Sequence, residues 1–116
     1  IRFEDKIRLL EIKTAEFSSL NNLTSPKEKH LDQIKCYATL LNLPNVICLY
    51  MDRQYGDTKC FEITVTDYEQ RQMREKMNKV MEAVETSIAP EGLDKRDPDC
   101  TPNMCMYYNT CKQWGR

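Results

Sequence analysis

Glu11 and Lys13 stand two positions apart in the stretch Leu9–Thr14, whose side chains alternate as in a β-strand. Residues at that spacing share one face of a strand and lie roughly 6.5–7 Å apart along its backbone. A carboxylate and an ammonium so placed can both reach one bound metal ion, water molecule or phosphate group. Considered alone, the tripeptide is better explained as an ion pair on a solvated strand face, because E-x-K occurs by chance in many chains.

A second pair of polar residues, Gln33 and Tyr37, is predicted to lie on the helix that follows this strand. Ser25 and Pro26 are typical of a helix start, with Ser at the N-cap, and the helix is expected to run to about Leu41. Residues four apart are stacked neighbours on one helix face. Tyr37 is explained well as a half-buried aromatic, whereas Gln33 lies among apolar residues and needs hydrogen-bond partners if it is buried.

The other elements are expected to build an α/β fold with a mixed central sheet flanked by helices. In chain order they are a β-hairpin over residues 1–13 that turns at Glu4 and Asp5, a polar loop over 14–25, the helix, and a strand hairpin over 46–51 and 58–65. We divide the chain into a core over residues 1–93 and a cysteine-rich tail over residues 94–116, in which no periodicity is visible.

A long helix is predicted to begin at the capping box formed by Thr66 and Glu69. Its apolar residues recur on a single stripe, which predicts core packing rather than a cofactor site. The stripe consists of Met73, Met77, Val80, Met81, Val84 and Ile88. Ala89 and Pro90 are expected to stop the helix.

Composition limits the classes of function. The chain has 116 residues, 41% of them hydrophobic and 30% charged, which suits one small domain. A formal net charge of -1 argues against a dispersed polybasic nucleic-acid binder, but a nuclease can rely on local charge and a metal ion. No apolar run is long enough to span a membrane and no export signal is visible, which favours an intracellular, reducing location.

The six cysteines fall into two groups. Cys36, Cys48 and Cys60 lie in predicted core elements, where a free cysteine packs as a small hydrophobe. The other three crowd together in the tail at positions 100, 105 and 111. An odd number of clustered cysteines suits metal ligation better than internal pairing. An iron–sulfur cluster, a zinc knot and thiols without metal remain the alternatives for this group.

The order of these motifs resembles that of RecB-like nucleases of the PD-(D/E)xK superfamily. The resemblance rests on an E-x-K strand, a Q-x-x-x-Y helix, a strand hairpin, a helix and a closing cysteine group. It is nearest to members with a C-terminal iron–sulfur cluster, such as the CRISPR-associated four-cysteine exonucleases. It implies a restriction-endonuclease-like core and a metal-dependent nuclease acting on single-stranded DNA or DNA ends. It also implies the cytoplasm of a bacterial or phage-infected cell, with helicases or other DNA-processing proteins as partners.

The resemblance assigns a role to each residue of the constellation. Glu11 would bind Mg²⁺ or Mn²⁺ together with the backbone carbonyl of Ile12, and Lys13 would orient or help to deprotonate the attacking water. Gln33 and Tyr37 would hold the nucleic-acid strand, joined by His30 one turn earlier on the same face. For His30, a satisfied residue at the start of a helix is about as good an explanation.

The chain departs from the family pattern in one respect. The family has an acidic metal ligand on the strand before E-x-K, and Asp5 lies in the predicted hairpin turn, too close to serve. Because the chain starts at Ile1, inside a predicted strand, we expect that ligand to lie upstream and the 116 residues alone to be inactive.

In the tail, the resemblance implies that three cysteines hold a [4Fe–4S] cluster, with a fourth ligand again before Ile1. The three cysteines are Cys100, Cys105 and Cys111.

Two other functions stay open: a catalytically inactive nucleic-acid-binding or scaffold domain of the same fold, and a zinc-stabilised protein-interaction module. A hydrolase with a Ser, Cys or His nucleophile is disfavoured, because the chain has one histidine and no motif places a nucleophile beside it.

Overall fold

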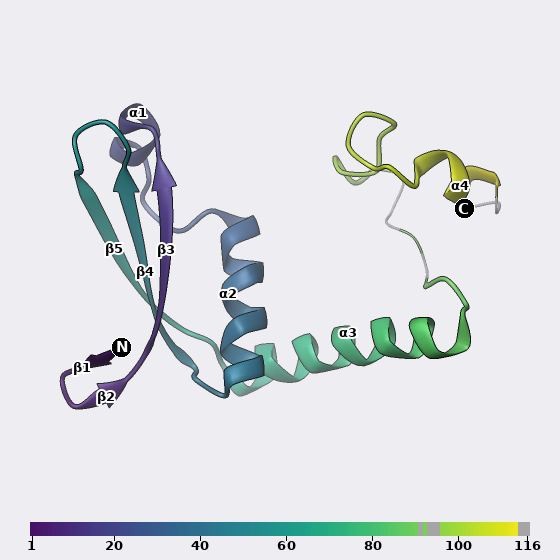
Figure 1. Ribbon diagram of the computed structural model, residues 1–116, viewed down its shortest axis with the longest axis horizontal. Helices are drawn as coiled ribbons and strands as arrows, with labels where there is room; N and C mark the ends of the chain where they lie inside the picture. The colour runs from purple at the N-terminus through teal and green to yellow at the C-terminus, as the bar shows by residue number, and fades with distance from the viewer. Residues whose placement is uncertain (91, 93–95, 114–116) are drawn as a thin grey trace. The chain divides into compact units, whose positions relative to one another are not determined.

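The computed structural model describes residues 1–90, 92 and 96–113 (Figure 1). The chain divides into two compact units, Ile1–Asn78 and Lys79–Arg116. In the first unit, β1 (Arg2–Phe3) and β2 (Lys6–Ile7) form a small antiparallel hairpin. The turn between them places Glu4 and Asp5 at φ values of 48° and 57°. Two consecutive left-handed residues are what a tight hairpin of this kind requires, so the predicted turn is confirmed.

The centre of the first unit is a three-stranded mixed sheet in the order β3-β4-β5. β3 (Leu9–Ala15) and β4 (Asn45–Asp52) run parallel, and β5 (Thr58–Thr64) pairs antiparallel with β4. Two parallel strands need a crossover connection, and here it includes α2 (Glu28–Leu41), which lies alongside the sheet (Figure 1). The predicted α/β class with a mixed sheet is therefore confirmed.

Two local predictions between β3 and α2 are wrong. The expected polar loop contains the short helix α1 (Phe17–Asn21), because Leu20 is buried in the core and so holds one helical turn against β4. The helix α2 begins at Glu28 with Lys27 as its N-cap, rather than with Ser25. The N–H of Lys27 donates to the Tyr50 hydroxyl at 3.1 Å, so a tertiary contact from β4 replaces the local side-chain cap.

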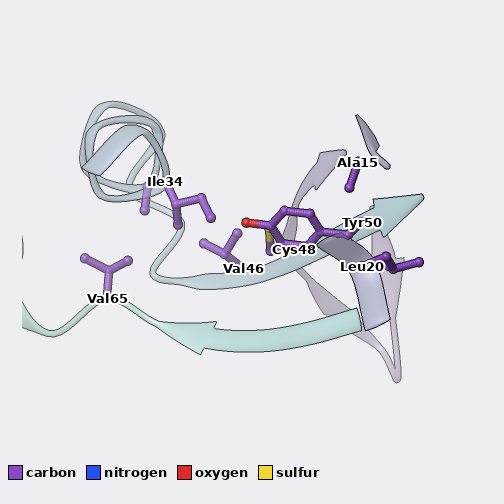
Figure 2. Close-up of a cluster of buried hydrophobic side chains, with 8 residues drawn as sticks. Ala15, Leu20, Ile34, Val46, Cys48, Tyr50 and Val65 are labelled. Carbon is purple, nitrogen blue, oxygen red and sulfur yellow. The ribbon is translucent and has the colours of Figure 1, made fainter. Parts of the chain in front are cut away.

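The core lies between one face of the sheet and the helices α1 and α2. Figure 2 shows Tyr50 and Val46 of β4 extending toward the helix that carries Ile34. The cluster consists of Ala15, Leu20, Ile34, Ala38, Val46, Cys48, Tyr50 and Val65. Of the three cysteines predicted to pack in the core, only Cys48 is buried there. Cys60 is exposed, because it pairs in register with Leu49 on the opposite face of the sheet from Cys48.

The helix α3 (Asp67–Thr86) begins as the sequence predicts. Thr66 accepts from the Glu69 N–H at 3.2 Å, and the Glu69 carboxylate accepts from the Thr66 N–H at 2.9 Å, which together form a capping box. The stripe of apolar residues is not core throughout. Its first two methionines are half-buried, but the rest are more than half exposed in the part of the chain that is described: Val80, Met81, Val84 and Ile88.

The second unit contains the C-terminal part of α3 and one short helix, α4 (Tyr108–Gln113), which the sequence analysis did not predict. Local backbone hydrogen bonds shape the tail, including those from the N–H groups of Cys100, Cys105 and Cys111 to the carbonyls of Asp97, Thr101 and Tyr107. Across the described ranges, no helix combines the length and apolar character needed to cross a bilayer.

Candidate functional site

The strand β3 turns Glu11 and Lys13 toward the face of the sheet that α2 covers. The ammonium of Lys13 lies 2.7 Å from Oε1 of Glu11, and the two side chains are only 17% and 14% exposed. The explanation as a solvated surface pair is therefore wrong. Partial burial reduces the screening of the two charges and fixes their separation.

Gln33 connects this ion pair to the helix. The Lys13 ammonium donates a hydrogen bond to Oε1 of Gln33, and Nε2 of Gln33 donates to the Tyr37 hydroxyl at 2.8 Å. An ammonium can only donate, so the amide oxygen must face Lys13 and the NH₂ must face Tyr37. The Tyr37 oxygen then accepts, and its own proton can be donated outward, where the side chain is 38% exposed. The hydrogen-bond partners expected for Gln33 are thus present.

His30 lies one turn before Gln33 and contacts the buried strand β4. Its Nδ1 is 2.7 Å from the Tyr50 hydroxyl, and the two rings are tilted by 33° at a centroid distance of 5.6 Å. Burial lowers the pKa of His30, as do the positive charges of Lys13, Lys29 and Lys27, while Glu11 opposes them. His30 is therefore a neutral imidazole in a locally cationic region near the Glu11–Lys13 pair.

The floor of the site consists of β4 residues that the sequence analysis did not single out. In the parallel register Cys48 is the partner of Glu11, and Tyr50 is the partner of Lys13. Burial raises the pKa of both the Cys48 thiol and the Tyr50 hydroxyl, so both keep their protons at neutral pH. One feature of the sequence could have indicated Tyr50: it has a polar hydroxyl within an otherwise apolar strand, and a buried tyrosine hydroxyl usually has a hydrogen-bond partner.

The chemistry of the donors at β3 fits a hard divalent cation in part. Lys13 contacts Oε1 of Glu11. The family resemblance assigns the metal to the Glu11 carboxylate and the Ile12 carbonyl. Mg²⁺ commonly uses one or two carboxylates, with waters and substrate phosphate completing its shell. Within the residues that are described, no three His, Cys, Asp or Glu side chains are grouped so as to hold a metal ion.

The same finding applies to the tail. Cys100, Cys105 and Cys111 are half-buried free thiols, and they do not form a group of metal ligands in the described part of the second unit. The described residues therefore give no positive support for an iron–sulfur cluster or a zinc knot, and no chemical step is assigned to such a group. The [4Fe–4S] cluster stays a prediction from the family resemblance.

Comparisons with protein-family models, curated proteins and solved structures gave no match. The E-x-K and Q-x-x-x-Y motifs and the contacts that join them are therefore the features that point to a function. All four motif side chains meet at one place, with His30 adjacent.

Proposed function

We propose that this protein is a metal-dependent nuclease that hydrolyses phosphodiester bonds in DNA. The observation that carries the proposal is the continuous hydrogen-bonded chain from Glu11 through Lys13 and Gln33 to Tyr37. All four residues that these contacts join are of the types that the resemblance to RecB-like nucleases leads us to expect.

Lys13 is suited to neutralise charge on a phosphate. Glu11 and Gln33 each accept from its ammonium, and an ammonium has three donors. The third donor can contact a phosphate oxygen or the attacking water. Because the two acceptors fix the position of the charge before substrate binds, Lys13 can stabilise the negative charge that develops during hydrolysis.

Gln33 and Tyr37 are suited to position the substrate. Gln33 fixes the orientation of the Tyr37 hydroxyl, which presents a donor at the rim of the site. A phosphate oxygen of the DNA backbone is an acceptor of the matching kind. Lys27 and Lys29 add positive charge near His30, which concentrates phosphate locally although the whole chain has a net charge of -1.

Glu11 and the Ile12 carbonyl would hold Mg²⁺ or Mn²⁺ beside Lys13. When bound, such an ion supplies a Lewis acid and an activated water. The substrate we propose is single-stranded DNA or a DNA end, in processing, repair, recombination or CRISPR adaptation.

The test measures cleavage of end-labelled single- and double-stranded DNA by the protein as its gene encodes it, with and without Mn²⁺ or Mg²⁺. Lys13→Ala is expected to reduce the metal-dependent rate by a factor on the order of 10²–10³, the effect of removing one preorganised charge-stabilising donor. Lys35→Ala is the matched control, because Lys35 is also a partly buried lysine paired with a glutamate, Glu69, at 3.1 Å.

Cleavage that requires metal, survives in Lys35→Ala and vanishes in Lys13→Ala supports the nuclease. Equal rates in wild type and Lys13→Ala would show that the site is assigned wrongly. DNA binding without any cleavage would support the inactive binding domain instead. Zinc in a protein that binds no DNA would favour the interaction module.

A further inference from the structure

The Tyr50 hydroxyl joins the floor of the site to the beginning of α2. Tyr50 is fully buried, with 0% of its surface exposed. Its oxygen accepts from the backbone N–H of Lys27 at 3.1 Å and lies 2.7 Å from Nδ1 of His30. One atom of β4 thus contacts both the N-cap of α2 and the imidazole on its first turn.

The chemistry of these partners determines the direction of the second bond. A backbone N–H can only donate, so it uses an acceptor position on the Tyr50 oxygen and leaves the hydroxyl proton to be placed. A buried hydroxyl proton needs an acceptor. The nearby Cys48 thiol is a weak acceptor, whereas an unprotonated imidazole nitrogen at 2.7 Å is a strong one. The Tyr50 hydroxyl therefore donates to Nδ1 of His30.

We infer that Tyr50 is a positioning residue that holds His30 as its Nε2–H tautomer and so provides a neutral donor for a phosphodiester oxygen beside Lys13. This inference rests on the proposed function, because it assigns the substrate contact of the same site. When Nδ1 accepts, the single proton of a neutral imidazole is on Nε2. The lowered pKa of His30 agrees with a neutral ring.

A neutral donor at this place has a physical advantage. Lys13, Lys27 and Lys29 already act on His30 with positive charge, and a fourth cation among them would be repelled. A fixed N–H adds a hydrogen bond to the phosphate without that repulsion. The Tyr50 contact also prevents the ring from rotating, so the donor is oriented before DNA binds.

The experiment is a long-range ¹H–¹⁵N correlation spectrum of uniformly ¹⁵N-labelled protein at neutral pH. His30 is the only histidine of the chain, so its two ring nitrogens can be assigned directly. The expected pattern is a protonated Nε2 and an unprotonated Nδ1. A majority of the Nδ1–H tautomer in the wild type would overturn the inference, and this measurement needs no variant to fold.

Tyr50→Phe removes only the hydroxyl and is expected to move the spectrum toward a mixture of tautomers. Tyr37→Phe is the matched control, because it removes a hydroxyl from the other branch of the site and should leave the His30 pattern unchanged. An unaltered His30 pattern in folded Tyr50→Phe would overturn the positioning role.

The substrate contact is tested by adding a short single-stranded oligothymidylate without divalent metal. The Nε2–H signal of His30 is expected to shift in the wild type and to shift several-fold less in Tyr50→Phe. No shift in the wild type would overturn the contact with phosphate. Both readouts are independent of cleavage. If the protein as its gene encodes it shows them but cuts no DNA with Mg²⁺ or Mn²⁺ present, the nuclease is refuted and the role of Tyr50 is kept.

Discussion

Lys13 on β3 and Gln33 on α2, 20 positions apart in the chain, are joined by a hydrogen bond from the ammonium to the amide oxygen. The parallel pairing of β3 with β4 requires a crossover, and α2 within that crossover lies on the face where Lys13 is. The bond therefore links the first strand of a βαβ unit, which carries the E-x-K motif, to its helix, which carries the Q-x-x-x-Y motif. Its effect on function is open to direct measurement.

Gln33 and Tyr37 are expected to contribute cooperatively to DNA binding. Gln33→Ala removes the acceptor of Lys13 and the donor that orients Tyr37, whereas Tyr37→Phe removes only the terminal hydroxyl. Each variant should weaken the binding of single-stranded DNA, Gln33→Ala more strongly. The double variant should lose less binding free energy than the two single variants together. The coupling energy, calculated from the dissociation constants in a double-mutant cycle, should be about 0.5–3 kcal/mol.

The chain provides a matched control for this cycle. On α3, Nε2 of Gln72 donates to the Tyr68 hydroxyl at 2.8 Å, which is the same pair of residue types at the same spacing. Gln72→Ala and Tyr68→Phe should leave DNA binding unchanged. Strictly additive losses of binding free energy at Gln33 and Tyr37 would contradict a functional link between their hydrogen bonds. Losses of equal size at Gln72 and Tyr68 would contradict it too.

His30 should make stability depend on pH on the acidic side of neutrality. Its folded pKa lies below the ordinary value of 6.5, so the unfolded chain binds its proton first as pH falls. The free energy of unfolding should therefore decrease as pH is lowered below 6.5, until the folded pKa is passed. Urea unfolding at a series of pH values measures this slope, and it should be smaller in His30→Gln.

The contribution of Lys13 to that shift can be isolated by NMR titration of the single imidazole. Lys13→Met should raise the pKa of His30 toward 6.5 but not restore it, because burial is the larger cause. Lys35→Met, which changes a lysine paired with Glu69, should leave the titration unaltered. An unchanged His30 pKa in Lys13→Met would contradict the proximity of the two side chains.

Four residues of the site were predictable because local rules place them. Glu11 and Lys13 share a strand face by alternation, and Gln33 and Tyr37 share a helix face by their spacing. That the two faces meet follows from a parallel strand connection, which the strand–helix–strand order already suggests. The four motif residues were thus available from the sequence, whereas their contact distances and the β4 residues beneath them were not.

The contacts of Tyr50 were not predictable in this way. They depend on the register of β4 against β3 and on where α2 begins, and both are set by packing between distant segments. The same contact explains why the Ser25 cap was wrong, since Lys27 takes its partner from β4. Similarly, the burial of Leu20 against the sheet is what turns part of a polar loop into α1.

The capping box of α3 gives a prediction about stability that is independent of function. Thr66→Ala should lower the free energy of unfolding by about 1 kcal/mol, the usual cost of losing an N-cap side chain.

Glu69 should make stability depend on pH in the acidic range. The Thr66 N–H and Lys35 lower the pKa of Glu69 below its ordinary 4.5, so the stabilisation by the Glu69 carboxylate is present above that value and is lost as pH falls through the folded pKa. Urea unfolding should show Glu69→Gln less stable than wild type at neutral pH and equal to it in strong acid. Glu75→Gln, an exposed change in the same helix, is the matched control variant.

The cysteine tail gives the sharpest test of the family resemblance, because the structure does not gather Cys100, Cys105 and Cys111 into a ligand group. Soft thiolates select iron–sulfur clusters or zinc, and a bound cluster would have to draw these thiols together. On the family resemblance, protein purified without oxygen is expected to contain iron and acid-labile sulfide, measured chemically. Cys105→Ala should lose both, whereas Cys36→Ala on α2 should keep them. Zinc without sulfide would replace the cluster by a zinc knot, and a metal-free protein would contradict both metal sites.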